Sequence, residues 1–206
     1  LGSDPYAMAI AAVDECVRNL VCVGADPTRI AILDNFCWPS CKDPRNMGAL
    51  VRACEGCYDA SKAFGAPFIS GKDSLNNQFV TEDGRTIQIA PTLLISGFAP
   101  VEKDTMAVSM DAKRAGSKLV LVGKTTNRLG GSHFALLAGA TTGATRIAAP
   151  DLIAGPRHAA AVARAIRAGV VRSAHDCSEG GLLVAAAEMA FSGRLGLSLD
   201  VGAMLT

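Results

Sequence analysis

Two short acidic segments flanked by glycine constrain this chain more than any other feature. Residues 70–77 read SGKDSLNN, and residues 174–181 read AHDCSEGG. In each segment glycine lets backbone N–H groups approach a ligand closely, and the same segment supplies a carboxylate and a hydroxyl. Such groups suit a magnesium–nucleotide complex, because N–H groups bind phosphate oxygens and carboxylates bind the metal. Neither segment has the spacing of a Walker loop or a dinucleotide fingerprint, so we expect a less common scaffold for nucleotide phosphates.

The first half of the chain alternates predicted helices and strands. Asp4 and Pro5 predict the start of a helix whose apolar positions recur at helical spacing as far as Val21. A buried strand over 30–33 follows and presents Asp34 at its carboxyl end. A second helix over 45–64 is expected to end at Gly65. Further strands are predicted over 67–69 and 92–98, with a hairpin of 78–80 and 86–89 between them.

The second half begins after a charged, irregular stretch, and we place a domain boundary there. Strands are predicted over 118–123, over 170–171 leading into the second acidic segment, and over 195–199. Helices are predicted after Ser132 and over 159–168 and 182–191. The fold class is therefore α/β (α+β), with one domain over 1–112 and another over 113–206.

Composition excludes several classes of function. The 206 residues are 50% hydrophobic but only 5% aromatic, so the core is built from Ala, Val, Leu and Ile. The 20 Lys and Arg residues balance 19 Asp and Glu residues, and without a basic patch we expect no nucleic-acid partner. Apolar runs are too short for a membrane span. Seven cysteines, an odd number, indicate reduced thiols and a cytoplasmic location. Because the chain starts at Leu1 without methionine, we expect it to be a piece of a longer one.

Several candidate ligand-binding residues have two interpretations on spacing alone. Glu15 and Asn19 lie one helical turn apart. They are either metal ligands or part of a solvated polar stripe. Asp34 is either a carboxylate that meets a ligand or a residue that forms a turn. Lys72 and Asp73 form either a phosphate site or an exposed ion pair in a turn.

Two other constellations are less favoured. Cys37 with Cys41 and Cys54 with Cys57 have the spacing of some zinc sites, but the second pair falls inside a predicted helix. His175 and Asp176 are adjacent on a predicted strand, where successive side chains face opposite ways, so we expect no mutual support between them. No catalytic residue is assigned within this chain.

Seven short motifs in a fixed order carry a family resemblance. They are DPY at 4–6, AVDE and RN at 12–15 and 18–19, VGADP at 23–27, LDNFCW at 33–38, GKDSL at 71–75 and HDCSEGGL at 175–182. Together they resemble the synthetase subunit of phosphoribosylformylglycinamidine synthase over essentially the whole chain. That family contains two tandem copies of a unit like aminoimidazole ribonucleotide synthetase. Each copy has an N-terminal domain that forms a barrel-like pair with its counterpart, then a C-terminal α/β domain. This chain resembles the second copy, with the C-terminal domain truncated.

The resemblance implies an ATP-dependent ligase of purine biosynthesis. Formylglycinamide ribonucleotide would be phosphorylated on its amide oxygen, and ammonia would then displace phosphate from the iminophosphate to give the amidine. The implied partners are the first synthetase copy, a glutaminase subunit that releases ammonia, and a small bridging subunit. The cofactors would be ATP and Mg²⁺.

The resemblance also implies roles for individual residues. It implies nucleotide contacts at Asp34, Gly71, Lys72 and Ser178. It implies a substrate contact at Ser74 and magnesium ligands at Glu15, Asn19 and Asp176. Lys72 departs from many relatives, which have asparagine there, and a protonated lysine can neutralise phosphate but cannot bind the metal. The family's catalytic histidine and phosphate-gripping loop belong to the first copy.

Two alternative functions stay open at this stage. The chain could be a structural repeat that holds an auxiliary nucleotide, or another ATP-dependent member of the aminoimidazole ribonucleotide synthetase superfamily. For a fragment that lacks the first copy, we expect an apolar sheet face, normally covered by that copy, through which the isolated chain self-associates. We also expect Asp176 to be a solvated carboxylate that contributes little to stability without a metal.

Overall fold

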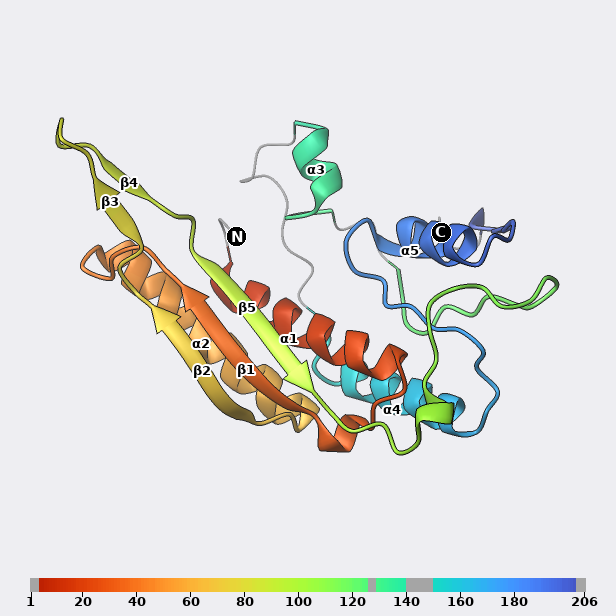
Figure 1. Cartoon of the computed structure of the whole chain (residues 1–206). Helices are drawn as coiled ribbons and strands as arrows, with labels where there is room; N and C mark the ends of the chain where they lie inside the picture. The colour runs from red at the N-terminus through yellow and green to blue at the C-terminus, as the bar shows by residue number, and fades with distance from the viewer. Residues whose placement is uncertain (1–3, 126–128, 140–149, 203–206) are drawn as a thin grey trace.

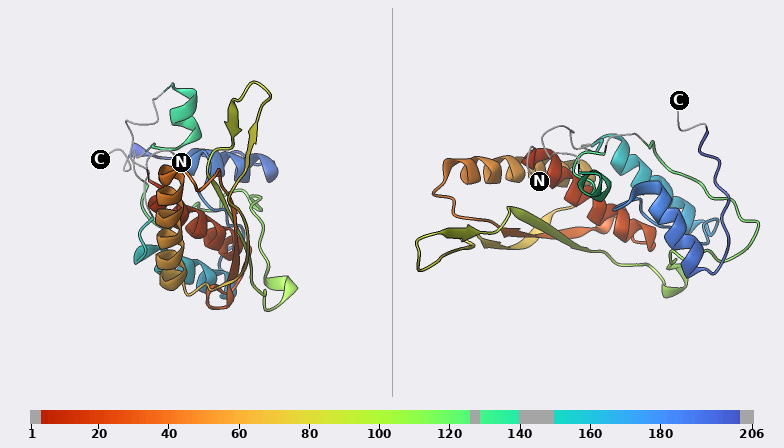
Figure 2. Two further views of the ribbon diagram at one scale, coloured as in Figure 1. Left: turned by 90° about the vertical axis from the view of Figure 1, so that its left-hand side faces the viewer. Right: turned by 90° about the horizontal axis from the view of Figure 1, so that it is seen from above.

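A three-stranded sheet backed by two long helices forms the centre of the computed structural model, which describes residues 4–125, 129–139 and 150–202 (Figure 1). The strand order is β2-β1-β5. The strands are β1 (Ala31–Cys37), β2 (Phe68–Ser74) and β5 (Thr92–Phe98). Strand β1 pairs parallel with β2 and antiparallel with β5. The helices are α1 (Pro5–Cys22) and α2 (Pro44–Phe64), and the two further views show both on the same side of the sheet (Figure 2).

Both long helices begin and end as the sequence predicts. The Asp4 side chain caps α1 by accepting a hydrogen bond of 3.0 Å from the N–H of Ala7. Asp43 caps α2 in the same way, and Gly65 ends that helix in the left-handed conformation, with φ of 64°. Helix α1 buries Val13, Val17 and other apolar residues against the sheet and α2. The hydrophobic period therefore fixes which face of α1 meets the core.

The sheet has one covered and one open face. Ile32, Phe36 and Leu93 are buried on the helix side, among core residues of α1 and α2. The alternating positions Leu94 and Phe98 face the opposite way, and each is 53% exposed. Helices thus protect only one side of this sheet, and large apolar side chains remain on the other.

The predicted hairpin is confirmed by strands β3 (Gln78–Val80) and β4 (Thr86–Gln88), which pair antiparallel. It extends away from the sheet and helices as a thin arm, at the upper left of Figure 1. The short 3₁₀ turn η1 (Pro27–Arg29) precedes β1, and a second one, η2 (Asp104–Met106), follows β5.

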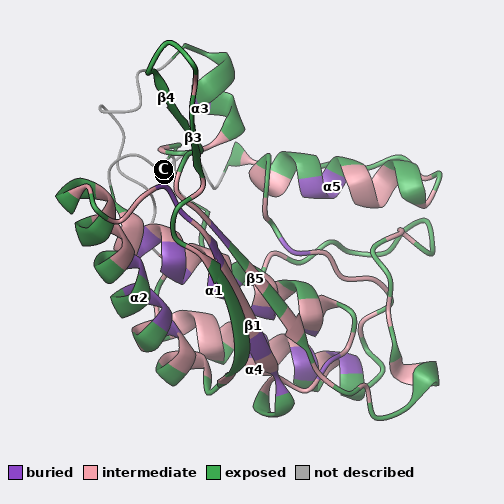
Figure 3. Cartoon of the chain, turned by 60° about the vertical axis from the view of Figure 1, so that its left-hand side comes forward, coloured by how far each residue is buried: buried purple, intermediate pink, exposed green. Residues whose placement is uncertain are grey.

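The described residues of the second half form the helices α3 (His133–Leu137), α4 (Ala154–Arg167) and α5 (Gly181–Ser192). Helix α4 packs on α1, where Ala159 and Ala163 join the same core as Val13. Helix α5 is held beside residue 112 by a hydrogen bond of 2.9 Å from the Ala112 N–H to the Met189 carbonyl. Most of α5 is exposed or half-buried, as Figure 3 shows. None of the helices described has the length and apolar character of a membrane span.

Two strands extend further than the sequence predicts. Strand β1 continues through Asp34 and Asn35 to Cys37, so Asp34 lies in mid-strand and not at the carboxyl end. Strand β2 likewise includes Gly71 to Ser74, which the sequence favours as a loop or turn. Both corrections have one cause: backbone pairing between β1 and β2 continues through these polar residues, since ladder hydrogen bonds do not depend on side chains.

Three other predicted strands are wrong. The segments 118–123, 170–171 and 195–199 form no ladder in the part of the chain that is described, and an isolated bridge joins Ser109 to Ser173. Val120, in the first of these segments, is 75% exposed. An apolar alternation forms a strand only beside a partner strand, and none lies next to these segments.

Candidate functional site

The second acidic segment meets helix α1 through Arg18. The Arg18 Nε donates a hydrogen bond of 2.7 Å to the Asp14 carboxylate, one turn earlier on the same helix. Its Nη1 donates bonds of 3.1 Å to the Cys177 carbonyl and to the Ser178 hydroxyl. The same nitrogen lies 3.6 Å from an oxygen of Asp176. Arg18 therefore connects residues about 160 positions apart in the sequence.

Asp176 is buried and fully engaged, contrary to the solvated carboxylate that the sequence suggested. The residue is only 7% exposed and accepts a hydrogen bond from the Ser178 hydroxyl. His175 also contacts it, with 3.4 Å between Nδ1 and a carboxylate oxygen. The prediction that these neighbours cannot meet is wrong because the segment is not a strand, so their side chains do not alternate. The Nε2 of His175 lies 2.9 Å from Glu188 of α5.

The start of α5 completes this site. Gly180 and Gly181 both have positive φ, 77° and 64°, and no side chain caps the helix. A Cβ on Gly180 would lie 2.6 Å from the Cβ of Val184, so glycine is required for this tight entry. No side chain caps the first turn of α5, and the positive end of a helix dipole favours a phosphate. The donor set here therefore fits a nucleotide phosphate.

The first acidic segment forms a second group of candidates around Asp34. Asp34 on β1 is the register partner of Gly71 on β2, and its carboxylate occupies the space that a Cβ on Gly71 would fill. Burial raises the pKa of Asp34, and the nearby carboxylate of Asp73 raises it further. Asp34 and Gly71, predicted from the resemblance to share a nucleotide, do lie in direct contact.

Lys72 and Ser74 lie on the other side of the sheet. Strand alternation places them opposite to Gly71 and Asp73, and the Lys72 ammonium donates a hydrogen bond to the Ser74 hydroxyl. Lys72 forms no ion pair with Asp73 among the described residues, so the exposed-turn interpretation is wrong. The side chains of one short segment thus serve two faces.

Glu15 and Asn19 line a hollow of 380 Å³ between α1 and β5, together with Leu93 and Gly97. Glu15 and Asn19 each follow Asp14 and Arg18 by one residue, so the two pairs lie on adjoining faces of α1. Asp176 approaches the face that carries Asp14 and Arg18. Carboxylate and amide oxygens of Glu15, Asn19 and Asp176 are the hard ligands that Mg²⁺ prefers. Within the described part of the chain, however, no group of three or more His, Cys, Asp or Glu side chains is arranged for a metal.

The cysteines support no zinc site. All seven are free thiols. Burial, followed by the nearby Cys54, raises the pKa of the Cys57 thiol to about 12. Within the described residues, no three His, Cys, Asp or Glu side chains are grouped so that they could hold a metal ion. Cys54 and Cys57 lie within α2, in agreement with the prediction that disfavours this interpretation.

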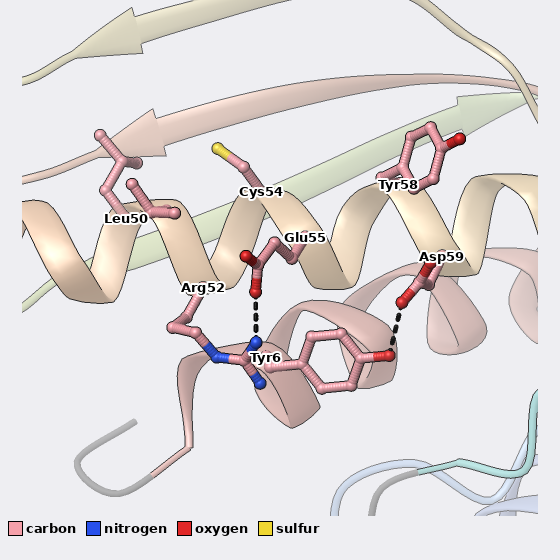
Figure 4. Close-up of a pocket in the computed structure, with 8 residues that line it drawn as sticks. Tyr6, Leu50, Arg52, Cys54, Glu55, Tyr58 and Asp59 are labelled. Atoms are coloured by element: carbon pink, nitrogen blue, oxygen red, sulfur yellow. Dashed lines mark hydrogen bonds and ion pairs between the residues drawn. The ribbon is translucent and has the colours of Figure 1, made fainter.

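Another hollow lies on the outer side of α1 and α2 (Figure 4). It measures 760 Å³, and none of the predicted site residues lines it. Its polar groups are already paired: Tyr6 donates a hydrogen bond of 2.7 Å to Asp59, and Arg52 lies 4.7 Å above the Tyr6 ring. Because the polar groups of this open hollow already bond to one another, it is less suited to nucleotide phosphates than the segment beside Arg18.

Sequence reasoning missed three contacts that shape the candidate sites. Arg18 contacts Ser178, Asp73 adjoins Asp34, and Glu188 contacts His175. A signal existed for Arg18 alone, since Asp14 and Arg18 have the spacing of a helical ion pair. The other two contacts depend on tertiary packing.

Two family models match the chain in order. The N-terminal domain of AIR synthase related proteins matches residues 1–99, and the C-terminal domain of the same proteins matches residues 114–205. The chain belongs to the AIR synthase related family. Together the two models account for nearly all of its length.

Several similar proteins carry the name phosphoribosylformylglycinamidine synthase subunit PurL, which bears out the predicted resemblance. The relative from Deinococcus radiodurans is 37% identical over 206 residues, which is 97% of this chain and 27% of the relative. A Synechococcus relative is 40% identical over 96% of this chain and 25% of its own length. The chain therefore spans about a quarter of the relatives it matches.

Solved structures show the same fold. "T. maritima PurL complexed with FGAR" matches 93% of this chain and 29% of its own, with a TM-score of 0.63 and 24% identity. "T. maritima PurL complexed with ATP" matches 92% of this chain and 27% of its own, with a TM-score of 0.59 and 21% identity. The predicted α/β fold class, with an N-terminal and a C-terminal AIR-synthase-type domain, is confirmed.

Proposed function

We propose that the protein containing this segment is an ATP-dependent ligase that converts formylglycinamide ribonucleotide and ammonia into formylglycinamidine ribonucleotide. One observation carries the proposal: proteins named for this synthase are 37% to 40% identical over 96% to 97% of the chain. The glycine-opened start of α5, beside Arg18 and Ser178, supports it because these donors suit nucleotide phosphates.

The proposed reaction has two steps. The amide oxygen attacks the γ-phosphorus of ATP, ADP leaves, and an iminophosphate forms. Ammonia then adds to the carbon of the iminophosphate, the carbon–oxygen bond to phosphate breaks, and inorganic phosphate leaves with the oxygen to give the amidine. Positioning and charge neutralisation would supply most of the catalysis, since phosphoryl transfer needs in-line alignment of its oxygens. Bound Mg²⁺ would neutralise phosphate charge.

The residues of this chain would divide these tasks. Ser178 would hold a nucleotide phosphate at the start of α5, while Glu15, Asn19 and Asp176 would provide oxygen ligands to Mg²⁺. On the sheet, Asp34 and the Gly71 backbone would contact nucleotide. On the opposite face, Lys72 would neutralise phosphate and Ser74 would contact the substrate.

The remaining partners follow from the same relationship. We propose a first synthetase copy in the same chain, a glutaminase subunit that delivers ammonia, and a small bridging subunit. We also propose a boundary between domains at residues 112 and 113, and a cytoplasmic location.

The test is an assay of the full-length protein with formylglycinamide ribonucleotide, ATP and ammonia, with the amidine detected by mass. Product that requires all three reactants supports the proposal, and its absence contradicts it. The isolated 206-residue segment should give no product, because the first copy is missing. Loss of turnover in Asp176→Asn would place the nucleotide of this copy in catalysis. Full turnover in that variant, with nucleotide binding lost, would instead favour the structural-repeat alternative.

A further inference from the structure

The Arg18 guanidinium makes a short hydrogen bond through Nε and longer ones through Nη1. Its Nε bond to Asp14 is 2.7 Å long, the length expected for a charge-assisted hydrogen bond. The two bonds made by Nη1 are 3.1 Å, and Asp176 lies at 3.6 Å, beyond hydrogen-bond distance. The guanidinium is therefore anchored through Asp14 while its Nη1 end can change partners.

The two groups that accept hydrogen bonds from Nη1 are weak partners for a cation. The Cys177 carbonyl and the Ser178 hydroxyl are neutral, so a doubly charged phosphate oxygen group would attract Nη1 more strongly. Within the described residues no acceptor takes a hydrogen bond from Nη2. The Arg18 side chain is 34% exposed, so this donor can reach a ligand.

The charges around Arg18 also matter. Asp14 is 8% exposed and Asp176 is 7% exposed, and Arg18 is the cation that pairs with both. A divalent cation bound to the same oxygen of Asp176 would compete with Nη1 for it, because like charges repel at such short distances. Phosphate would remove that conflict by offering Nη1 a new anionic partner.

We propose that Arg18 binds a phosphate of the nucleotide at the start of α5, anchored by Asp14, and competes with divalent metal for Asp176. The inference rests on the proposed function, because it assigns one more residue to the same nucleotide site. It predicts opposite effects on two ligands. Loss of the guanidinium should weaken nucleotide binding and strengthen binding of metal alone.

The experiment measures binding to the full-length protein by calorimetry, with ADP plus Mg²⁺, ADP plus chelator, and Mn²⁺ alone. Arg18→Met should raise the Kd for ADP about tenfold or more, with and without metal, since it removes a charge-assisted hydrogen bond. It should lower the Kd for Mn²⁺. Arg18→Lys should retain only part of the ADP affinity, because one ammonium cannot contact Asp14 and phosphate in the guanidinium geometry.

Arg167→Met is the matched control, since Arg167 lies 3.6 Å from Asp26 in another ion pair and should leave every Kd unchanged. Equal ADP affinity in wild type and Arg18→Met would overturn the inference while leaving the proposed function intact. Equal loss in Arg18→Met and Arg167→Met, with matching falls in unfolding temperature, would show a structural effect and overturn it too. Failure of the wild type to bind ADP would overturn both the proposed function and the inference.

Discussion

The Asp34 carboxylate lies over Gly71 of the neighbouring strand, in the space that any larger residue at that position would need. The Asp34 Cγ is 2.8 Å from where a Cβ on Gly71 would stand. Asp34 points to the helix side of the sheet, the same side as Ile32 and Phe36. Glycine at position 71 thus leaves room for the Asp34 carboxylate on the helix side of the sheet.

The first prediction concerns this pair. Gly71→Ala should destabilise the protein by about 1–3 kcal/mol, because the new methyl group overlaps Asp34. Asp34→Ala should relieve the overlap. The double variant should therefore lose less stability than the sum of the losses in the two single variants. Gly48→Ala in α2 is the control: nothing lies within 4 Å of its added Cβ, and alanine should gain up to about 1 kcal/mol there. Urea unfolding curves measure all four, and additive effects would contradict the overlap.

The second prediction concerns the pH dependence of stability. Burial, with help from Asp73, raises the pKa of Asp34 in the folded protein, so its ionised form is less favourable there than in the unfolded chain. The contribution of Asp34 is most favourable below the ordinary aspartate pKa of about 3.9 and is lost as pH rises through the raised value. Asp34→Asn should therefore gain stability relative to wild type as pH rises through this window.

Asp83→Asn provides a control of opposite sign. A hydrogen bond from Thr81 lowers the pKa of the Asp83 carboxyl, so its stabilisation is present at neutral pH and is lost as pH falls through the lowered value. Unfolding free energies for each variant, measured against wild type across the acidic range, should diverge in opposite directions. Parallel curves for wild type and Asp34→Asn would contradict the raised pKa.

Local signals predict the helices of this fold, and tertiary pairing decides the rest. Asp4 and Gly65 mark helix ends correctly because capping depends on neighbours in sequence. The ends of β1 are not marked by its sequence, since pairing with β2 continues through Asp34 regardless of polarity. Conversely, the segment 118–123 resembles a strand but has no ladder partner among the described residues.

The same distinction applies to the candidate site. The sequence places Asp176 and Ser178 together, because a short turn before a glycine-opened helix requires it. It does not reveal Arg18 as their partner, since that contact joins residues 160 positions apart. The burial of Asp176 likewise follows from α1 and α5 packing around the segment, which no local pattern encodes.

The third prediction concerns Asp176 and nucleotide-linked stability. At a hundredfold excess of Mg²⁺-ATP over its Kd, binding should stabilise the wild type by about 2.7 kcal/mol. Asp176→Ala should abolish this increment. Because Asp176 is buried and pairs with Arg18, the variant should also lose roughly 1–3 kcal/mol without ligand.

Thermal unfolding with and without Mg²⁺-ATP separates the two effects. Glu179→Ala is the control, since this neighbouring carboxylate is exposed and should leave the increment unchanged. An equal ligand-induced shift in wild type and Asp176→Ala would mean that the nucleotide binds elsewhere.

The fourth prediction concerns the open face of the sheet. Leu94 and Phe98 project from β5, away from the helices, and each is 53% exposed, so the isolated segment should self-associate through this face. Replacing both with serine should weaken the association at least about tenfold, because burying each side chain contributes about 1.5–3 kcal/mol. Leu137→Ser, a change at an exposed leucine on α3, should have no effect. Sedimentation equilibrium at micromolar concentration measures the three proteins, and a monomeric wild type would contradict the prediction.

Because association covers Leu94 beside the hollow that Glu15 and Asn19 line, it should also reduce solvent access to that hollow.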